Sequence, residues 1–297
     1  MAARTPLLDE WLAGTRPWIE SELERALRSA GESAPRSLVE AMEYAVLGGG
    51  KRFRPALVRL TARWLGAGDD ACAAPAAAVE LIHAYSLVHD DLPCMDDDDF
   101  RRGKPSCHKK YGEALAVLAA DALQAKAFEV LATGGGARAA EMVLVLARAC
   151  GDRGMVGGQV LDVALTGHAA TFGDVAWMHS MKTGALIAAS AELGSIAAGA
   201  PPHSRELARQ WGEALGRLFQ AVDDLLDATA DRAALGKTPG KDERQHKPTL
   251  VAALGVDGTR KLAGEQAERA RVLAMELGGP WSSTGLQMVD FLLDRGS

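Results

Sequence analysis

The sequence predicts an all-α fold, and three observations support that prediction. Apolar residues recur at spacings of three and four along most of the chain, as they do on one face of a helix. Alanine, a strong helix former, is abundant, whereas aromatic residues make up only 5% and β-branched runs are absent. No Pro/Gly/Ser-rich linker divides the 297 residues, so we expect residues 1–297 to form a single domain.

The helical spacing extends over ten segments, several of them close to 20 residues or longer. In chain order they are 18–30, 37–47, 54–66, 73–92, 112–132, 137–150, 173–198, 204–230, 257–277 and 282–294. No segment alternates polar and apolar residues as a half-buried strand would. The polar motifs lie at the breaks: a glycine run at 48–50, an acidic run interrupted by Pro93, and a charged segment at 231–248.

Composition and charge exclude several classes of protein. The net charge is −6 without a basic tail, so a nucleic-acid partner is not expected. The acidic residues Asp9 and Glu10 come too early for a signal peptide, and no apolar run is long enough to cross a membrane. We therefore expect a cytoplasmic protein without membrane insertion. Four widely spaced cysteines, none in a C-x-x-C pair, are then reduced thiols: Cys72, Cys94, Cys107 and Cys150.

The first acidic cluster, HDDLPCMDDDD at 89–99, ends a long Ala-rich helix. On a continuous helix Asp90 and Asp96 would point roughly 120° apart. Pro93 lacks a backbone donor and ends regular helix just before itself. We therefore expect the chain to loop out between the two aspartates, bringing Asp96 back beside Asp90.

The second acidic cluster, FQAVDDLLD at 219–227, lies near the end of another long helix. Asp223 and Asp227 are four residues apart and share a helical face with Gln220. Grouped carboxylates repel one another unless a cation lies between them. Carboxylate oxygens with open positions suit Mg²⁺, which usually also binds substrate phosphate.

Two other interpretations of these clusters fit the sequence less well. A solvated acidic helix end would explain one cluster alone, but two clusters recur here within apolar helices. An EF-hand needs Gly at its sixth position and Glu at its twelfth. Counted from Asp90 these positions are Met95 and Arg101, and counted from Asp96 they are Arg101 and Cys107, so neither register fits.

Basic residues suited to a diphosphate occur at two places in the sequence. Lys51, Arg52 and Arg54 follow the flexible glycine run, and Arg101 and Arg102 directly follow the first cluster. The planar guanidinium group of arginine matches phosphate oxygens.

Three further polar positions have both a functional and a structural interpretation. Lys182, beside Thr183 in an apolar helix, is either a phosphate ligand or a surface lysine whose aliphatic side-chain carbons pack against the protein. His83 lies seven residues before Asp90 on nearly the same face, and is a ligand or a core histidine. Gln159 and Asp162 form either a functional pair or the exposed start of a helix.

The chain resembles the trans-isoprenyl diphosphate synthases, and within that family the bacterial enzymes that make a fifteen-carbon product. The resemblance covers about residues 40 to 250, with all motifs in the family's order. It implies a bundle of long helices around a central cavity. The matching stretches are GGGKRFRP (48–55), HAYSLVHDDLPCMDDDDFRRGKPSCH (83–108), GGQVLD (157–162), MKTGALI (181–187), FQAVDDLLD (219–227) and LGKTPGKDERQHKPT (235–249).

The resemblance also implies a role for each matching residue around one cavity mouth. Two Mg²⁺ ions would bind Asp90 and Asp96, and a third would bind Asp223. The supporting polar residues would be Asp91, Gln159, Asp162, Asp224 and Asp227. The allylic diphosphate would contact Arg101, Lys182 and Lys237, with Lys247 nearby, and isopentenyl diphosphate would contact Lys51, Arg54, His83 and Arg102. Near the developing carbocation, oxygens would come from Thr183 and Gln220.

Product length and assembly are further expectations from the resemblance. Tyr85 and Ser86 lie five and four residues before Asp90, so a chain growing down this wall would meet the Tyr85 ring about 7.5 Å deeper. An aromatic residue here is typical of farnesyl diphosphate producers, and smaller residues accompany twenty-carbon products. The family is usually homodimeric, and the Ala-rich helix 112–132 offers an apolar face for a partner.

Rival functions share parts of this pattern. Within the family, the main alternative is a geranylgeranyl diphosphate synthase. A terpene cyclase usually replaces the second cluster with an Asn/Ser/Glu triad, and a non-catalytic synthase subunit usually loses an acidic cluster. This chain retains both clusters and the basic residues, so a prenyltransferase is the favoured interpretation.

Overall fold

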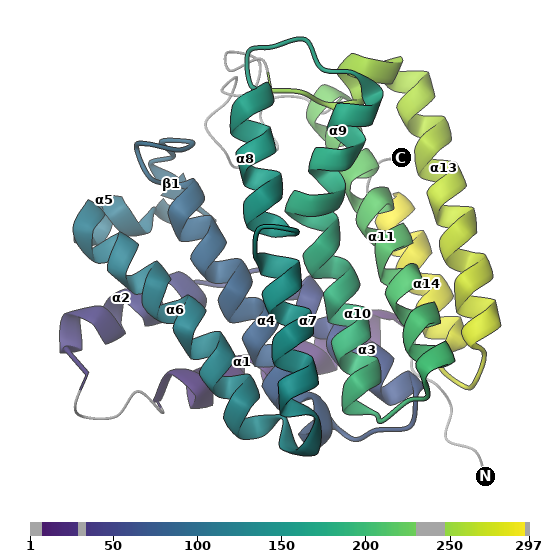
Figure 1. Ribbon diagram of the computed structural model, residues 1–297, viewed down its shortest axis with the longest axis horizontal. Helices are drawn as coiled ribbons and strands as arrows, with labels where there is room; N and C mark the ends of the chain where they lie inside the picture. The colour runs from purple at the N-terminus through teal and green to yellow at the C-terminus, as the bar shows by residue number, and fades with distance from the viewer. Residues whose placement is uncertain (1–7, 29–33, 230–246, 295–297) are drawn as a thin grey trace.

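Helices account for almost all regular structure in the computed structural model, which describes residues 8–28, 34–229 and 247–294 (Figure 1). The all-α prediction is therefore confirmed. The elements in chain order are α1 (Leu8–Arg28), α2 (Arg36–Val46), α3 (Phe53–Trp64), α4 (Asp69–Asp90), β1 (Phe100–Arg101), β2 (Lys104–Pro105), α5 (Cys107–Tyr111), α6 (Glu113–Gly134), η1 (Gly136–Arg138), α7 (Ala139–Cys150), α8 (Met155–Leu165), α9 (Phe172–His179), η2 (Ser180–Gly184), α10 (Ala185–Ala197), α11 (Pro202–Thr229), α13 (Leu250–Leu277) and α14 (Ser282–Asp294).

Two hydrophobic cores share a central wall. One core contains α4, α6 and α7, and the other contains α11, α13 and α14. Both α3 and α10 contribute to each: Leu186 of α10 packs in the first core, and Ile187, the next residue, packs in the second. In Figure 1 these middle helices stand between the α4–α6 side and the α11–α13 side.

Some helix boundaries differ from the expected ones because tertiary packing overrides local propensity. α1 begins at Leu8, not 18, and continues through Pro17 because Leu8, Trp11 and Thr15 bury the same face as Ile19. α13 begins at Leu250 and bends at Gly255, whose φ is 73°. α8 was not among the ten expected helical segments, because its first turns contain two glycines and two valines, which are weak helix formers.

A short antiparallel strand pair follows the first acidic cluster, although no strand was expected. Phe100 pairs with Pro105 and Arg101 pairs with Lys104. Arg102 and Gly103 form the connecting turn, with φ of 54° and 75°. Positive φ at both central residues is the geometry of a type I′ turn, which matches the twist of a two-residue hairpin. Two-residue strands are too short to produce a recognisable alternation.

The expected helix 173–198 is a nearly continuous rod formed by α9, η2 and α10. Its middle section, η2, is a π-helix of five residues that contains Lys182 and Thr183. A π-helical turn inserts one extra residue into a helix and is frequent at functional sites. The polar break in the sequence thus coincides with a break in the helical hydrogen-bond pattern.

Among the described helices, α4 is long and apolar enough to cross a membrane. The expectation that no apolar run has the length to do so was therefore wrong for this helix. However, 72% of its most apolar window is buried inside the protein. Much of its apolar character comes from alanine, and its small side chains let α3 and α6 pack against it. A helix of this kind is typical of a protein core.

Candidate active site

The chain does loop out after α4, as Pro93 predicted. The backbone N–H of Asp96 donates to the carbonyl of Asp90 at 2.8 Å, and that of Asp98 donates to Asp91 at 3.2 Å. Asp97 donates similarly to Leu92 at 3.0 Å. These bonds fold the loop back over the helix end and place Asp96 next to Asp90.

Burial and neighbouring charges determine the ionisation of the first cluster. The pKa of Asp90 is raised to about 6, mainly by burial; the charge of Lys182 opposes this rise, and the negative charge of Asp96 contributes to it. Burial also raises the pKa of Asp91, against the effect of its ion pair with Arg101. A cation held between Asp90 and Asp96 would favour the ionised carboxylate.

The second cluster lies on the face of α11 that packs against η2 and α10. A Cβ at Gly216 would lie 2.8 Å from the Cα of Gly184, which shows how closely α11 approaches the π-helical turn. Gln220 and Asp223 follow Gly216 by four and seven residues and therefore continue the same face. The second acidic cluster is thus directed along the side of α11 that carries η2.

Asp224 is a structural anchor in this cluster. Its side chain is buried and accepts hydrogen bonds from the backbone N–H of Leu250 at 2.6 Å and from the Gln220 amide at 3.1 Å. Burial raises its pKa to about 6, and these two hydrogen bonds oppose that rise. Asp224 therefore holds the first turn of α13 against α11 and also orients Gln220.

One short segment joins the two acidic clusters. The Lys247 ammonium lies 2.9 Å from Oδ1 of Asp96 in the first cluster. Three residues later, Leu250 binds Asp224 in the second cluster. Asp96 and Asp224 are 128 residues apart in sequence, yet both contact residues 247–250. This bridge places them at the same end of the bundle.

Asp162, a residue of α8, positions the side chain of Lys182. Its ammonium forms an ion pair with the buried carboxylate of Asp162, and its positive charge also lowers the pKa of Asp90. Gly158 makes this approach possible, because a Cβ there would lie 2.1 Å from the backbone nitrogen of Lys182. In the same motif, Gln159 is half-buried on α8. Lys182 thus connects Asp162 to the first acidic cluster.

A second group of cations lies beside α4. Burial, followed by the charges of Arg54 and Arg102, lowers the pKa of His83 well below its ordinary value. Burial also lowers the pKa of Arg54, whose Nε has no hydrogen-bond partner among the described residues. Arg54, His83 and Arg102 therefore form a positively charged group around a neutral imidazole, which is suited to an anion.

The glycine run and Arg52 organise this group. Arg102 donates to the carbonyl of Gly49, and a Cβ on Gly50 would lie 2.7 Å from the Arg102 guanidinium carbon. Arg52 is buried and forms ion pairs with Glu20 and Glu80. Its charge is thus balanced within the protein, whereas Lys51 of the same motif is exposed.

The two residues expected to limit product length differ in burial. Tyr85 is buried at 4% exposure, and its ring meets that of His89 edge-on with centroids 5.7 Å apart. Burial raises its pKa, as do the charges of Cys150 on α7 and of Asp90. Ser86 is only half-buried and donates to the carbonyl of His83 at 2.9 Å. Tyr85 therefore lies within the wall between α4 and α7, near the first cluster.

Lys237, Thr183 and Asp227 complete the set of expected residues. Lys237 lies outside the described residues. Thr183 is half-buried in η2, and Asp227 is exposed at the end of α11. A small, open pocket lies beside the β1–β2 hairpin, lined in part by Tyr44, Arg101 and Arg102. The central cavity implied by the resemblance stays a prediction.

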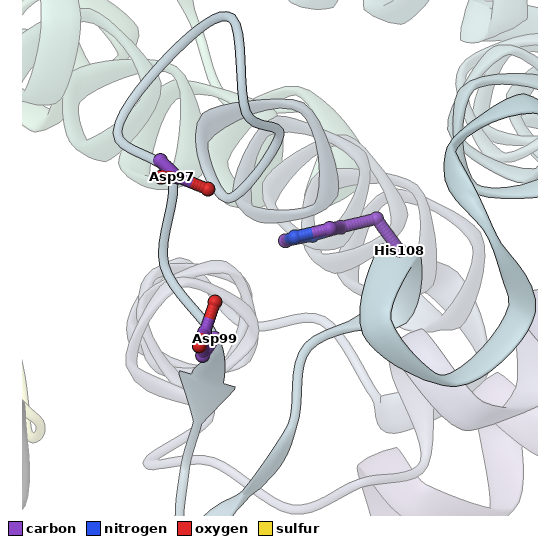
Figure 2. A group of neighbouring side chains, drawn as sticks. All are labelled: Asp97, Asp99 and His108. Atoms are coloured by element: carbon purple, nitrogen blue, oxygen red, sulfur yellow. The ribbon is translucent and has the colours of Figure 1, made fainter.

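The structure also assembles a group that the sequence interpretation missed. Within the described residues, the ligand atoms of Asp97, Asp99 and His108 lie within 4.8 Å of one another (Figure 2). Asp90, Asp96 and Asp223 are not members of this group. An Asp-x-Asp pattern followed nine residues later by histidine was the available signal, but the hairpin that brings the three together was not foreseen.

Comparisons with known proteins identify a family. The sequence model of the polyprenyl synthetase family matches residues 35–272. The farnesyl diphosphate synthase of Escherichia coli (strain K12) is 40% identical over 292 residues, which cover 92% of this chain and 98% of that protein. A chloroplastic geranylgeranyl pyrophosphate synthase of Capsicum annuum is 44% identical over 242 residues, 80% of this chain and 66% of that protein.

Solved structures give the same result. The apo structure of an FPP/GFPP synthase from Zymomonas mobilis superposes with a TM-score of 0.85 at 33% identity, covering 96% of this chain and 98% of that one. A geranyltransferase from Legionella pneumophila superposes with a TM-score of 0.84 at 32% identity, covering 97% of both chains. Sequence and fold are thus shared over nearly the whole chain.

Proposed function

The chain belongs to the polyprenyl synthetase family and is a trans-isoprenyl diphosphate synthase; we propose that its product is (2E,6E)-farnesyl diphosphate. In this reaction isopentenyl diphosphate condenses head to tail with dimethylallyl or geranyl diphosphate and releases diphosphate. The observation that supports it best is the bridge at residues 247–250, which joins both acidic clusters at one end of the bundle. A diphosphate between the clusters could contact metals on both.

The donor set fits Mg²⁺. Asp90, Asp96 and Asp223 offer carboxylate oxygens, which this cation prefers, and burial of Asp90 beside Asp96 disfavours two negative charges without a cation. We assign Asp90 and Asp96 to two ions and Asp223 to a third. Bound Mg²⁺ supplies positive charge that stabilises the departing diphosphate.

Other residues of the chain bind the allylic diphosphate and stabilise the carbocation. Lys182 and Arg101 hold the allylic diphosphate, with Lys237 and Lys247, and their charges favour ionisation of its C–O bond. Thr183 and Gln220 present oxygens to the developing carbocation. The central cavity that the resemblance implies would exclude water, which would otherwise capture that cation.

Isopentenyl diphosphate binds the second cationic group. Arg54 and Arg102 supply positive charge, and the low pKa of His83 leaves it a neutral hydrogen-bond donor. Lys51, in the same motif as Arg54, adds an exposed cation. The double bond of this substrate then attacks the allylic cation, and a proton is lost to the released diphosphate.

Product length is the main alternative within this function. Tyr85 is buried on α4 close to Asp90, where its ring can close the path of a growing chain, which favours fifteen carbons. The 44% identity to a geranylgeranyl pyrophosphate synthase favours a twenty-carbon product instead. Incubation with isopentenyl diphosphate and each allylic substrate separately decides between them: chain growth stops at fifteen carbons in our proposal, and farnesyl diphosphate is then not extended.

We also propose a cytoplasmic homodimer. Val117 and Leu118 of α6 and Leu144 of α7 are large apolar side chains with 37%, 57% and 49% exposure. A two-fold partner covering them would remove this apolar surface from water. Light scattering at micromolar concentration gives a dimeric mass if this assembly forms, and a monomeric mass contradicts it.

A further inference from the structure

We propose that Asp97, Asp99 and His108 form an additional divalent-cation site, distinct from the carboxylates assigned above. The carboxylates and the imidazole converge in Figure 2, with all ligand atoms within 4.8 Å of one another. Two carboxylates beside one imidazole are a common donor set for a protein-bound metal. The proposed occupant is a divalent cation that binds nitrogen as well as oxygen, such as Mn²⁺ or Zn²⁺.

The histidine is the first reason to infer a ligand here. His108 is only 5% exposed, and its Nε2 has no hydrogen-bond partner among the described residues. Its other ring nitrogen, Nδ1, lies 3.1 Å from the hydroxyl of Ser106. When Nδ1–H donates to that hydroxyl, Nε2 keeps a lone pair. Figure 2 shows the far end of the imidazole ring directed toward the two carboxylates. A buried nitrogen without a partner is unfavourable, and a metal ion would satisfy it.

The backbone holds the two aspartates toward this ring. Asp97 adopts a left-handed conformation with φ of 50°, and its N–H donates to the carbonyl of Leu92 at 3.0 Å. The carbonyl of Asp99 accepts from the N–H of Ser106 at 2.8 Å. Because Ser106 is two residues before His108, this bond fixes the separation between Asp99 and the imidazole. The Asp99 carboxylate also contacts Lys109 at 2.8 Å, and a bound cation would share it with this ammonium.

The donor types select the cation. Mg²⁺ is usually bound through oxygen alone and keeps several waters. Imidazole nitrogen raises affinity for Zn²⁺ and its transition-metal neighbours, and carboxylates also suit Mn²⁺. The site therefore differs in preference from Asp90, Asp96 and Asp223, although Asp97 directly follows Asp96 in the chain.

A cation at this site would brace the β1–β2 hairpin. Asp97 and Asp99 precede β1, and His108 follows β2, so the ion ties the two ends of the hairpin together. Arg101 and Arg102 lie between those ends. This consequence rests on the proposed function, in which the two arginines hold the substrate diphosphates. Occupancy would then support substrate binding from outside the catalytic metal site.

Binding is tested on the full chain with Mn²⁺ alone, without diphosphates. Pulsed electron paramagnetic resonance of the bound Mn²⁺ detects a coordinated imidazole through modulation by its nitrogen. We expect this signal in the native protein and its loss in His108→Gln. It should persist in Asp90→Asn and in the control His89→Gln, whose histidine adjoins the catalytic aspartate. Absence of nitrogen modulation in the native protein, or its persistence in His108→Gln, overturns the proposal.

A second variant tests the same site if His108→Gln fails to fold. Asp97 is exposed, and asparagine tolerates its left-handed backbone. Asp97→Asn should weaken Mn²⁺ affinity at this site at least about tenfold, as loss of a supporting ligand does. Unchanged affinity contradicts the assignment. Because the signal is read without substrate, failure of the prenyltransferase assay leaves this result standing, and failure here leaves the proposed reaction untouched.

Discussion

The ammonium of Lys247 lies 2.9 Å from Oδ1 of Asp96 and attaches the chain that precedes α13 to the first acidic cluster. Both side chains remain partly exposed to solvent, at 22% and 24%. An ion pair of this kind contributes little to global stability. Its position is more important, because it places a cation where the allylic diphosphate is proposed to bind.

Replacing Lys247 should therefore reduce catalysis more than stability. We expect Lys247→Ala to lower kcat/KM for geranyl diphosphate by about 10²-fold, since one charged contact to the leaving group is lost. Lys247→Arg should retain most activity. Lys261→Ala, at an exposed lysine of α13, is the matched control. Steady-state kinetics measure the effect, and equal activity of Lys247→Ala and the control would remove Lys247 from the site.

Arg54 should act on isopentenyl diphosphate rather than on the allylic substrate. Its guanidinium lies among the cations that depress the pKa of His83. Loss of a charged hydrogen bond costs about 1.5–3 kcal/mol, so Arg54→Ala should raise the KM for isopentenyl diphosphate about tenfold or more. The KM for geranyl diphosphate should change little. A larger change for geranyl diphosphate would place Arg54 in the other subsite.

The ring of Tyr85 should limit product length. Tyr85→Ala removes the buried ring near Asp90, so we expect products beyond fifteen carbons, including geranylgeranyl diphosphate. Tyr85→Phe keeps the ring and should still stop at fifteen carbons. Chromatography of radiolabelled products distinguishes the two variants. If Tyr85→Ala is active and stops at fifteen carbons, another residue closes the cavity.

Gly158 should be required for the close packing of α8 on η2. A Cβ in Gly158→Ala would lie 2.1 Å from the Lys182 backbone nitrogen, and such overpacking costs about 1–3 kcal/mol. Gly264→Ala, in α13, meets nothing within 4 Å and should stabilise by about 0.5–1 kcal/mol through helix propensity. Urea denaturation compares the two. Equal stabilities would show that α8 adjusts without strain.

Local patterns predicted the fold class and the shape of the first cluster. Pro93 predicted the loop because its consequence is confined to neighbouring residues, and the hydrogen bond from Asp96 to Asp90 confirms it. The long rod around Lys182 followed from its apolar spacing. The continuation of α1 through Pro17 could not be predicted, because it depends on burial of a face against distant helices.

Long-range partners were beyond the reach of sequence reasoning. Asp223 and Asp224 are adjacent, and spacing alone does not show that Asp224 is the one that anchors Leu250. The pairing of Lys182 with Asp162 likewise depends on the contact between α8 and η2. The group that includes His108 was missed because a type I′ hairpin, rather than helical spacing, brings it together.

The central claim is that both acidic clusters hold one leaving diphosphate, and one rate measurement tests it directly. Formation of farnesyl diphosphate from geranyl and isopentenyl diphosphates is followed in Mg²⁺ for the native protein, Asp90→Ala and Asp223→Ala. Asp121→Ala, at an exposed aspartate of α6, is the control. We predict a loss of at least about 10³-fold for each cluster variant, native rates for the control, and abolition by chelation that added Mg²⁺ reverses. A native rate in either Asp90→Ala or Asp223→Ala would contradict the claim.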